Sequence, residues 1–488
     1  ARGSLIIILN KHIMPRLIAA LILLCSWTAL PAAESIDIGS RRELFVDDYL
    51  INRLEGSAKL VVQKPVPREV VLVTDKPWEG SSCLYFTIFQ DGDKYRMYYR
   101  GLQVQDRQLV HREVVCYAES RDGVKWMRPE LGLIEFDGSK KNNIVWDGIG
   151  SHNFTPFIDH NPKCRPEAKY KAIGRGKRTP DGKPGSVYQL FAFQSPDGIH
   201  WSSMRDEPVL THGRFDSQNV AFWDAERNCY VAFYRDSLNG YRAVRTATSR
   251  DFLHWGEHRF LGFRGAARQH HYTNAIQRYD RAPHLLVGFP TRFLPRSKFP
   301  DRPEWTEPIL IAGRDGRSFR LWNDPIIPAN TRATSGNRSN YISWGLVQLP
   351  GKANEYSLYA AEDRRTGTSM RLRRYSYRTD GFVSVSARNS AGELLTKPLK
   401  FCGNRLVVNY SAKSGGSLRV ELQDADGKPF SGYELGNSQV NGGDKIERTA
   451  TWKKTNDVSQ LTDHPIRLRF VLKDADLYSF QFNSNAKP

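Results

Sequence analysis

The sequence has 488 residues, of which 71 are Lys or Arg and 52 are Asp or Glu, so its formal net charge is +19. Apolar residues make up 40% and charged residues 25%, a mixture that excludes a disordered, collagen-like or coiled-coil chain. The aromatic fraction of 11% favours β-sheet. The basic balance fits a polyanionic partner, and it equally fits an Arg-rich proteome in which most proteins are basic.

The first 33 residues have the pattern of a secretory signal. Basic residues, the last of them Arg16, precede the apolar run Leu17–Trp27, and small residues follow up to Ala33. The apolar run is too short to span a bilayer. We therefore expect a signal peptide at residues 1–33, a mature protein that is secreted or periplasmic, and no membrane contact after cleavage.

The cysteines predict neither a disulfide framework nor a metal site. Cys25 lies in the signal, and the other five are an odd number at irregular spacings without a Cys-x-x-Cys pair. Gly-x-Gly-x-x-Gly, Walker A, His-Glu-x-x-His and Gly-x-Ser-x-Gly motifs are absent as well. We expect no cofactor and no metal. Dispersed arginines in an exported protein also argue against a nucleic-acid partner.

A seven-residue pattern, Ser-x-Asp-Gly-x-x-Trp, recurs in the first four-fifths of the chain. Asp-Gly is expected to turn between two strands, and the Trp three residues later to pack over that turn. Four segments share this frame, the last of them diverged: Ser120–Trp126, Ser195–Trp201, Ser249–Trp255 and Gly313–Phe319.

Strand-like apolar segments between these turns form five pairs. The pairs are 81–89 with 95–100, 153–158 with 170–174, 218–223 with 230–235, 273–277 with 284–289, and 342–349 with 356–361. Five strand pairs at a spacing of about 70 residues predict an all-β chain with a five-bladed β-propeller over residues 34–388. A sandwich with insertions is the structural alternative.

The character of the sequence changes near residue 389. Short alternating segments separated by Gly-rich turns follow, without the Asp-Gly-Trp pattern. We expect a C-terminal β-sandwich over residues 389–488.

This organisation resembles the five-bladed glycoside hydrolases of families 32, 43, 68 and 130, and most closely the secreted family 32-like proteins of planctomycetes. Glu43–Ile51 resembles their start and Ile466–Phe480 their end. The resemblance implies a carbohydrate substrate and three carboxylates around a central funnel: a nucleophile or base, an acid, and a partner that tunes their pKa values. The motif Trp-Met-Asn-Asp-Pro-Asn-Gly of family 32 has a counterpart only at Trp322–Pro325, after the fourth repeat, so the motif does not identify the catalytic residues.

The direction of the predicted strands identifies candidate catalytic residues where the family 32 motif does not. In a propeller blade the first strand begins, and the antiparallel second strand ends, on the same face. Three carboxylates from three blades fall on this rim: Glu79, Asp216 and Glu362. Glycosidic cleavage needs carboxyl groups on both sides of the bond. We expect Asp216 to act as base or nucleophile, Glu362 as acid and Glu79 as the third partner, the alternative for each being a strand-end ion pair.

The same rim carries candidates for substrate binding. Arginines there suit the carboxylate or sulfate groups of a uronate-containing or sulfated glycan, unless each one pairs with an acid of the neighbouring blade. Histidine and tyrosine can donate to sugar hydroxyls, and tryptophan can stack on a sugar ring. The predicted binding residues are Trp78, Arg100, His152, Asn153, Arg235, His271, Tyr272, Arg292 and Trp344.

Two functions are consistent with the sequence. The first is a secreted glycosidase that hydrolyses O-glycosyl bonds of a polysaccharide or oligosaccharide, and the arginines of the rim favour an anionic one. The second is a catalytically silent propeller that binds glycans or a surface partner. The lack of family 32 motifs favours the second function, and three funnel carboxylates from separate blades favour the first.

Overall fold

The computed structural model describes residues 35–106, 108–177, 187–295, 304–329, 339–439, 442–462 and 464–484. The expected signal segment lies outside these residues. Where the structure is described it is dominated by strands, and helical structure is limited to short 3-10 turns such as Pro166–Ala168, so the all-β prediction is confirmed. Within these ranges no helix is long and apolar enough to cross a membrane.

Three four-stranded antiparallel sheets follow one another along the chain, and in each of them the strands pair in chain order. They consist of β6 (Leu84–Asp91), β7 (Lys94–Gly101), β10 (Val114–Ser120) and β11 (Ile144–Trp146); β12 (Gly150–Ile158), β13 (Tyr170–Lys177), β14 (Tyr188–Ser195) and β15 (Ser202–Ser203); and β16 (Val220–Asp224), β17 (Cys229–Leu238), β18 (Tyr241–Ser249) and β19 (Trp255–Phe260). A hairpin of β8 (Val104–Gln105) and β9 (Gln108–Leu109) lies between β7 and β10 in the sequence.

A fourth group of strands comprises two sheets. One contains β20 (Gly262–Arg264), β22 (Gln277–Tyr279), β23 (Ala282–Gly288), β26 (Leu310–Gly313) and β27 (Ser318–Trp322), and the other β21 (His270–His271), β24 (Thr291–Leu294) and β25 (Trp305–Pro308). In the first of these sheets β20 runs parallel to β27, and the remaining neighbours are antiparallel.

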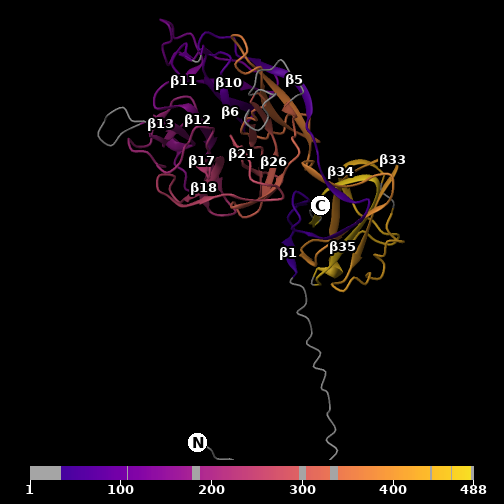
Figure 1. Ribbon diagram of the computed structural model, residues 1–488. Coiled ribbons are helices and arrows are strands. Elements are labelled where there is room, and N and C mark those ends of the chain that lie inside the picture. Colours follow the sequence, from indigo (N-terminus) through magenta and orange to yellow (C-terminus); the bar gives the residue numbers. More distant parts are fainter. Residues whose placement is uncertain are drawn as a thin grey trace, which may run out of the picture. The chain divides into compact units, whose positions relative to one another are not determined.

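A fifth group joins distant parts of the chain. It contains β28 (Glu355–Glu362), β29 (Arg371–Arg378) and, from the N-terminal side, β5 (Val66–Val73). Bridges at Ile342 and Val347 pair residues 342–347 with β28, so all five predicted strand pairs are present. Figure 1 shows the groups in succession, from the violet β6 and β10 through the magenta β12 and β17 to the red β26, with the indigo β5 beside orange strands.

The recurring Ser-x-Asp-Gly-x-x-Trp segment forms the same turn at the end of the third strand in three sheets. In the first copy the Ser120 hydroxyl accepts the N–H of Gly123 at 2.9 Å, the Asp122 carboxylate accepts backbone N–H groups at 2.8 Å, and the Trp126 indole donates to the Gly123 carbonyl at 3.2 Å. Equivalent bonds occur in the copies at 195–201 and 249–255. Local side-chain hydrogen bonds therefore explain why the pattern recurs.

Strands that open different sheets also contact one another. The Ile88 N–H in β6 donates to the Trp344 carbonyl at 2.8 Å, and the Trp344 N–H donates to the Phe86 carbonyl at 2.8 Å. The Gln218 amide, next to β16, donates to the Phe86 carbonyl and the Thr87 hydroxyl, each at 3.1 Å. The first strands of three sheets therefore meet in one buried centre.

A separate eight-stranded antiparallel sheet contains most of the C-terminal strands. It consists of β33 (Arg405–Gln423), β35 (Arg467–Asn483), β34 (Gly443–Thr449), β31 (Gly392–Thr396), β30 (Val383–Ala387), β2 (Glu43–Leu44), β3 (Ile51–Gly56) and β4 (Lys59–Val62). In addition, β1 (Ile36–Gly39) pairs in parallel with β32 (Leu399–Phe401).

The expected boundary between 34–388 and 389–488 does not follow this pairing. β3 pairs with β31, β4 pairs with β30 and β2 pairs with β35, so residues 36–62 and 383–387 belong with the C-terminal strands. The sequence pattern identifies a strand but not its distant partner, which explains the error. The two-layer sandwich itself stays a prediction.

The centre of the sheets leaves no space for a side chain at Gly345. Gly345 has φ 127°, and a Cβ atom there would lie 1.7 Å from the Ile88 carbonyl oxygen. We expect Gly345→Ala to lower the free energy of unfolding by about 3 kcal/mol or more. Gly351→Ala is the matched control, because Gly351 also has a positive φ, 70°, but nothing within 4 Å of its Cβ position. Denaturant unfolding of both variants checks this, and equal losses of stability would contradict the close packing.

Candidate functional site

A cavity of about 520 Å³ opens where the first strands begin. Side chains from all five groups of strands line it. The lining residues are Tyr85, Arg100, Leu102, Val104, Asp106, Leu109, Glu113, His152, Asp216, Tyr272, Arg364 and Arg365. We call this space the Asp216 cavity. It contains four of the predicted site residues: Asp216, Arg100, His152 and Tyr272.

Asp216 lies in a short turn that two buried asparagines hold. Asn153 donates to the Phe215 carbonyl at 2.9 Å and also to the Ser217 carbonyl, and Asn219 donates to the same carbonyls at 3.1 and 2.9 Å. Phe215 is buried and has a left-handed backbone, with φ 51°. This arrangement presents the Asp216 side chain, which is 46% exposed, to the cavity.

Basic side chains surround the Asp216 carboxylate. Its Oδ1 atom lies 3.4 Å from Nε2 of His152 and 2.9 Å from Nη1 of Arg175. The hydrogen bond with His152, together with the charges of Arg175 and Arg235, outweighs burial and holds the pKa of Asp216 below its ordinary value. Asp216 is therefore an ionised, solvent-accessible base at neutral pH.

Glu113 is a second carboxylate of the cavity, which the sequence analysis missed. Its Oε1 atom lies 2.7 Å from Nδ1 of His152 and 3.7 Å from Nη1 of Arg100. Burial by itself raises the pKa of Glu113, but the hydrogen bond with His152 and the charges of Arg100 and Arg175 lower it to about 2. His152 thus lies between two ionised carboxylates. Glu113 directly precedes β10, which is the third strand of its sheet and runs in the same direction as the first strand. This position could have identified Glu113 as a residue of the same rim.

Arg100 and Tyr85 form the wall of the cavity next to β6. Arg100 is 4% exposed, donates to the Ser82 carbonyl at 3.0 Å, and places its guanidinium 4.8 Å from the centre of the Tyr85 ring. Tyr85 has φ 59° at a bulge in β6, a conformation that aromatic residues rarely adopt. Burial raises the pKa of Tyr85 well above its ordinary value, so its hydroxyl keeps its proton.

Tyr272 lines another side of the cavity, and Tyr341 packs against Tyr272 from outside the lining. The Tyr272 and Tyr341 rings meet edge to face with their centres 5.5 Å apart. The guanidinium of Arg235 lies 5.7 Å from the Tyr272 ring centre, and that of Arg364 lies 5.5 Å from the Tyr341 ring centre. Apolar ring surface beside hydrogen-bonding groups is the composition that sugar rings require.

Two of the three predicted catalytic carboxylates do not line the cavity. Glu79 is completely buried, and its carboxylate accepts hydrogen bonds from Arg128 at 2.8 Å and from the Tyr99 hydroxyl. Burial raises the pKa of Glu79, although Arg128 opposes the change. Glu362 is 2% exposed and accepts from Nε of Arg373 at 2.8 Å. Strand direction places both acids at the expected end of their sheets, but each is paired with an arginine, Arg128 or Arg373, outside the lining of the cavity.

Three predicted binding residues do not line the cavity, and two of them, Asn153 and Arg235, act on Asp216. Trp78 packs against Phe136 and donates from its indole to Asn143 at 2.6 Å. Asn153 is fully buried and holds the turn that carries Asp216. Arg235 lowers the pKa of Asp216 through its charge, without lining the cavity.

Three further predicted binding residues lie elsewhere. His271 is buried in the wall of another cavity, and burial lowers its pKa to about 3. Arg292 is paired with Glu307, whose Oε1 atom lies 3.0 Å from its Nε. Trp344 lines a cavity of about 400 Å³ at the other ends of the first strands, where its indole donates to the Ile276 carbonyl at 2.9 Å. A residue of a first strand can lie at either end of the sheet, and the sequence pattern does not show at which end Trp344 lies.

The described residues contain no group of three or more His, Cys, Asp or Glu side chains that could hold a metal ion. The described cysteines are unpaired; Cys83 and Cys116 are buried, and Cys229 is half-buried.

Comparison with known proteins finds similarity in solved structures alone. No family model and no curated protein matches the chain. A structure described as a glycoside hydrolase covers 64% of this chain and 92% of its own, at 14% identity and a TM-score of 0.46. An N-acetylgalactosamine deacetylase from F. plautii, in complex with blood group B trisaccharide, covers 70% and 96%, at 13% identity and a TM-score of 0.43. A glycosyl hydrolase from Bacteroides ovatus covers 68% and 97%, at 14% identity and a TM-score of 0.43.

Removing Glu113 tests the charge arrangement. The pKa of Glu113 falls from 4.5 to about 2 on folding, so its ionised form stabilises the protein above pH 4.5, and this stabilisation is lost as the pH falls towards 2. We expect Glu113→Gln to lower the free energy of unfolding by about 1–3 kcal/mol at pH 7, with a difference from wild type that shrinks on acidification. Denaturant unfolding between pH 7 and pH 2 measures this, with the exposed Glu130→Gln as control. A difference independent of pH would contradict the assignment.

Proposed function

We propose that this protein is a glycan-cleaving enzyme of the glycoside hydrolase type, and that the reaction takes place in the Asp216 cavity. The observation that carries the proposal is the state of Asp216. Its carboxylate is 46% exposed, is held ionised by His152 and Arg175, and stands in a cavity lined from all five groups of strands. An accessible carboxylate that stays ionised is the group that glycosidic cleavage uses as base or nucleophile.

We also propose the five-bladed propeller as the architecture of this enzyme. Two cavities at opposite ends of the same first strands support it. The Asp216 cavity lies where these strands begin, and the cavity of about 400 Å³ is lined by residues further along each of them: Ile88, Phe157, Phe222, Gln277 and Trp344. Openings at both ends of a common axis are expected when blades surround a central channel.

In the proposed reaction Asp216 acts on the anomeric carbon of the sugar. As a base it takes a proton from a water molecule while the water oxygen forms a bond to the anomeric carbon; the bond from that carbon to the leaving oxygen breaks, and the leaving oxygen receives a proton. Glu113 holds Nδ1 of His152 at 2.7 Å and thereby sets which ring nitrogen faces Asp216. The proton for the leaving oxygen would come from His152 or Tyr272, which line the cavity, because burial makes the Tyr85 hydroxyl a weaker acid.

A glycan-binding protein without catalysis is the second candidate. Among the described residues, the two cavity carboxyl groups whose pKa values are shifted, Glu113 and Asp216, both have lowered values. A glycosidase ordinarily keeps one carboxyl group protonated as the acid, by raising its pKa. This observation favours binding alone, and the turnover assay below separates the two functions.

The surroundings of the cavity support an acidic glycan as the substrate. Arg100, Arg364 and Arg365 line it, and Arg175 and Arg235 act on Asp216 from outside the lining. Guanidinium groups bind planar anions such as carboxylates and sulfates. We propose a uronate-containing or sulfated polysaccharide as the substrate class. The protein would meet it outside the cytoplasm, after the signal segment 1–33 has directed its export.

Replacing Asp216 tests catalysis directly. We expect Asp216→Asn to reduce the release of reducing ends about 100-fold or more, because the amide can neither accept the water proton nor stabilise positive charge. The assay uses the protein from Glu34 onward with a panel of neutral, uronic and sulfated polysaccharides. Tyr272→Phe and His152→Gln, assayed beside it, show which side chain delivers the proton.

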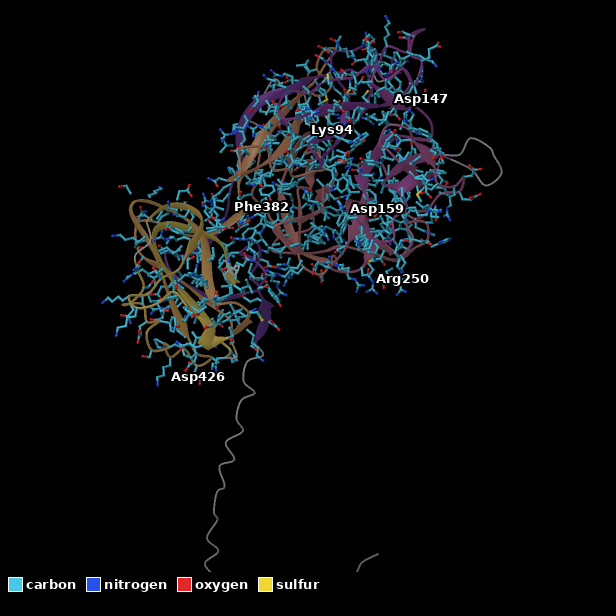
Figure 2. The ribbon with its side chains drawn as sticks, turned by 180° about the vertical axis from the view of Figure 1, so that it is seen from behind. Lys94, Asp147, Asp159, Arg250, Phe382 and Asp426 are labelled. Atoms are coloured by element: carbon cyan, nitrogen blue, oxygen red, sulfur yellow. The ribbon has the colours of Figure 1, made fainter. Side chains whose placement is uncertain are left out.

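Asp426→Asn is the matched control, since Asp426 is an exposed carboxylate of the C-terminal region (Figure 2). Glycan binding without release of reducing ends would support the second candidate. Turnover that survives Asp216→Asn would show that another carboxylate performs the reaction.

A further inference from the structure

Arg364 is a buried cation of the cavity that has no counter-ion in the described structure. It follows the end of β28, is 4% exposed and lines the Asp216 cavity. Its Nε and Nη1 atoms have no hydrogen-bond partner, and its guanidinium lies 5.5 Å from the centre of the Tyr341 ring. Burying a charged group without an anion is unfavourable by several kcal/mol. An aromatic face compensates for only part of this cost.

The acidic residues next to Arg364 in the sequence do not neutralise it. Glu362 binds Nε of Arg373 at 2.8 Å, and Asp363 binds Arg371 at 2.5 Å. Both arginines belong to the neighbouring strand β29. The backbone on either side of Arg364 is left-handed, with φ 57° at Asp363 and 58° at Arg365, an arrangement that is strained for residues other than glycine. The chain therefore adopts an unfavourable local conformation where it directs Arg364 to the cavity.

Two other arginines, one in the lining of the cavity and one outside it, differ in this respect. Arg100 donates to the Ser82 carbonyl at 3.0 Å and lies 3.7 Å from Glu113. Arg175 is paired with Asp216 at 2.9 Å. Their charges serve to keep the two carboxylates ionised, so they are not available to neutralise a ligand. Arg364, in contrast, keeps its full charge for a ligand.

We propose that Arg364 is the specificity-determining residue of the cavity, and that it binds an anionic substituent of the bound sugar. This inference rests on the proposed function, because it places the sugar in the Asp216 cavity. The two side chains have different roles: Asp216 acts in the reaction at the anomeric carbon, and Arg364 neutralises a carboxylate or sulfate elsewhere on the glycan. A sugar with that group gains a charge-assisted hydrogen bond, and a neutral sugar leaves the buried guanidinium unpaired.

Isothermal titration with matched oligosaccharides tests the inference apart from catalysis. The probes are oligogalacturonides and oligoglucuronides, the neutral galactose and glucose oligosaccharides of the same linkages, and the 6-sulfated forms of the neutral sugars. With wild type, we expect the anionic probes to bind about 10- to 100-fold more tightly than their neutral counterparts. A preference for uronates identifies a carboxylate as the natural group, and a preference for sulfated probes identifies a sulfate ester.

Arg364→Gln is expected to remove this preference and to leave the weak binding of neutral sugars unchanged. Arg364→Lys, which keeps the charge but loses the planar guanidinium, should restore part of it. Arg250→Gln is the control, because it removes an equal charge from an exposed position outside the lining of the cavity (Figure 2).

A purely structural role for Arg364 predicts a different result. Removing a buried charge that lacks a partner should leave the denaturation midpoint of the ligand-free protein unchanged or raise it. A large fall in that midpoint, or equal affinities of wild type for anionic and neutral probes, would overturn the inference. Binding of uronates that depends on Arg364, without release of reducing ends from any glycan, would uphold the inference and refute the proposed hydrolysis.

Discussion

The amide groups of two buried asparagines determine where the principal carboxylate of the cavity lies. Asn153 and Asn219 each use their donor and acceptor atoms: the amide nitrogens bind the carbonyls on both sides of Asp216, and the amide oxygens accept the N–H groups of Arg175 and Arg235 at 2.7 and 3.0 Å. Both side chains are fully buried. Since an unpaired buried polar group is costly, the turn, the two second strands and their arginines are locked together.

This arrangement makes the cavity a site of fixed charges. Asp216 and Glu113 are ionised because hydrogen bonds and cations act on them from positions that the backbone determines, and His152 connects the two acids. Strained backbone at Phe215, with φ 51°, and at Tyr85, with φ 59°, lies at this end of the sheets. Positive φ at bulky residues persists only where the surrounding packing enforces it, and such positions concentrate at functional sites. Charge and strain therefore indicate the same place in the fold.

Reasoning from the sequence located the end of the sheets better than it located the individual side chains. Strand direction correctly brought Asp216, Arg100, His152 and Tyr272 to one cavity. The same rule, applied to third strands, would have included Glu113, which precedes β10. It could not exclude Glu79 and Glu362, because these acids stand at the correct end of their sheets and differ in being paired with arginines outside the lining of the cavity. The sequence did not predict Arg364 as a site residue for the opposite reason: Arg364 differs from the paired arginines of the site in lacking an ion-pair partner among the described residues, and no sequence pattern shows this.

The sequence by itself determined the all-β character, the five strand pairs and the repeated turn, because each depends on contacts between residues close together in the chain. The tertiary structure decided which distant strands pair, so that residues 36–62 join the C-terminal sheet and β5 joins β29. It also decided which of the acids and arginines at one end of the sheets face the cavity and which neutralise each other beneath it. Ion pairing depends on distances of a few ångströms between residues far apart in sequence, and folding alone sets those distances.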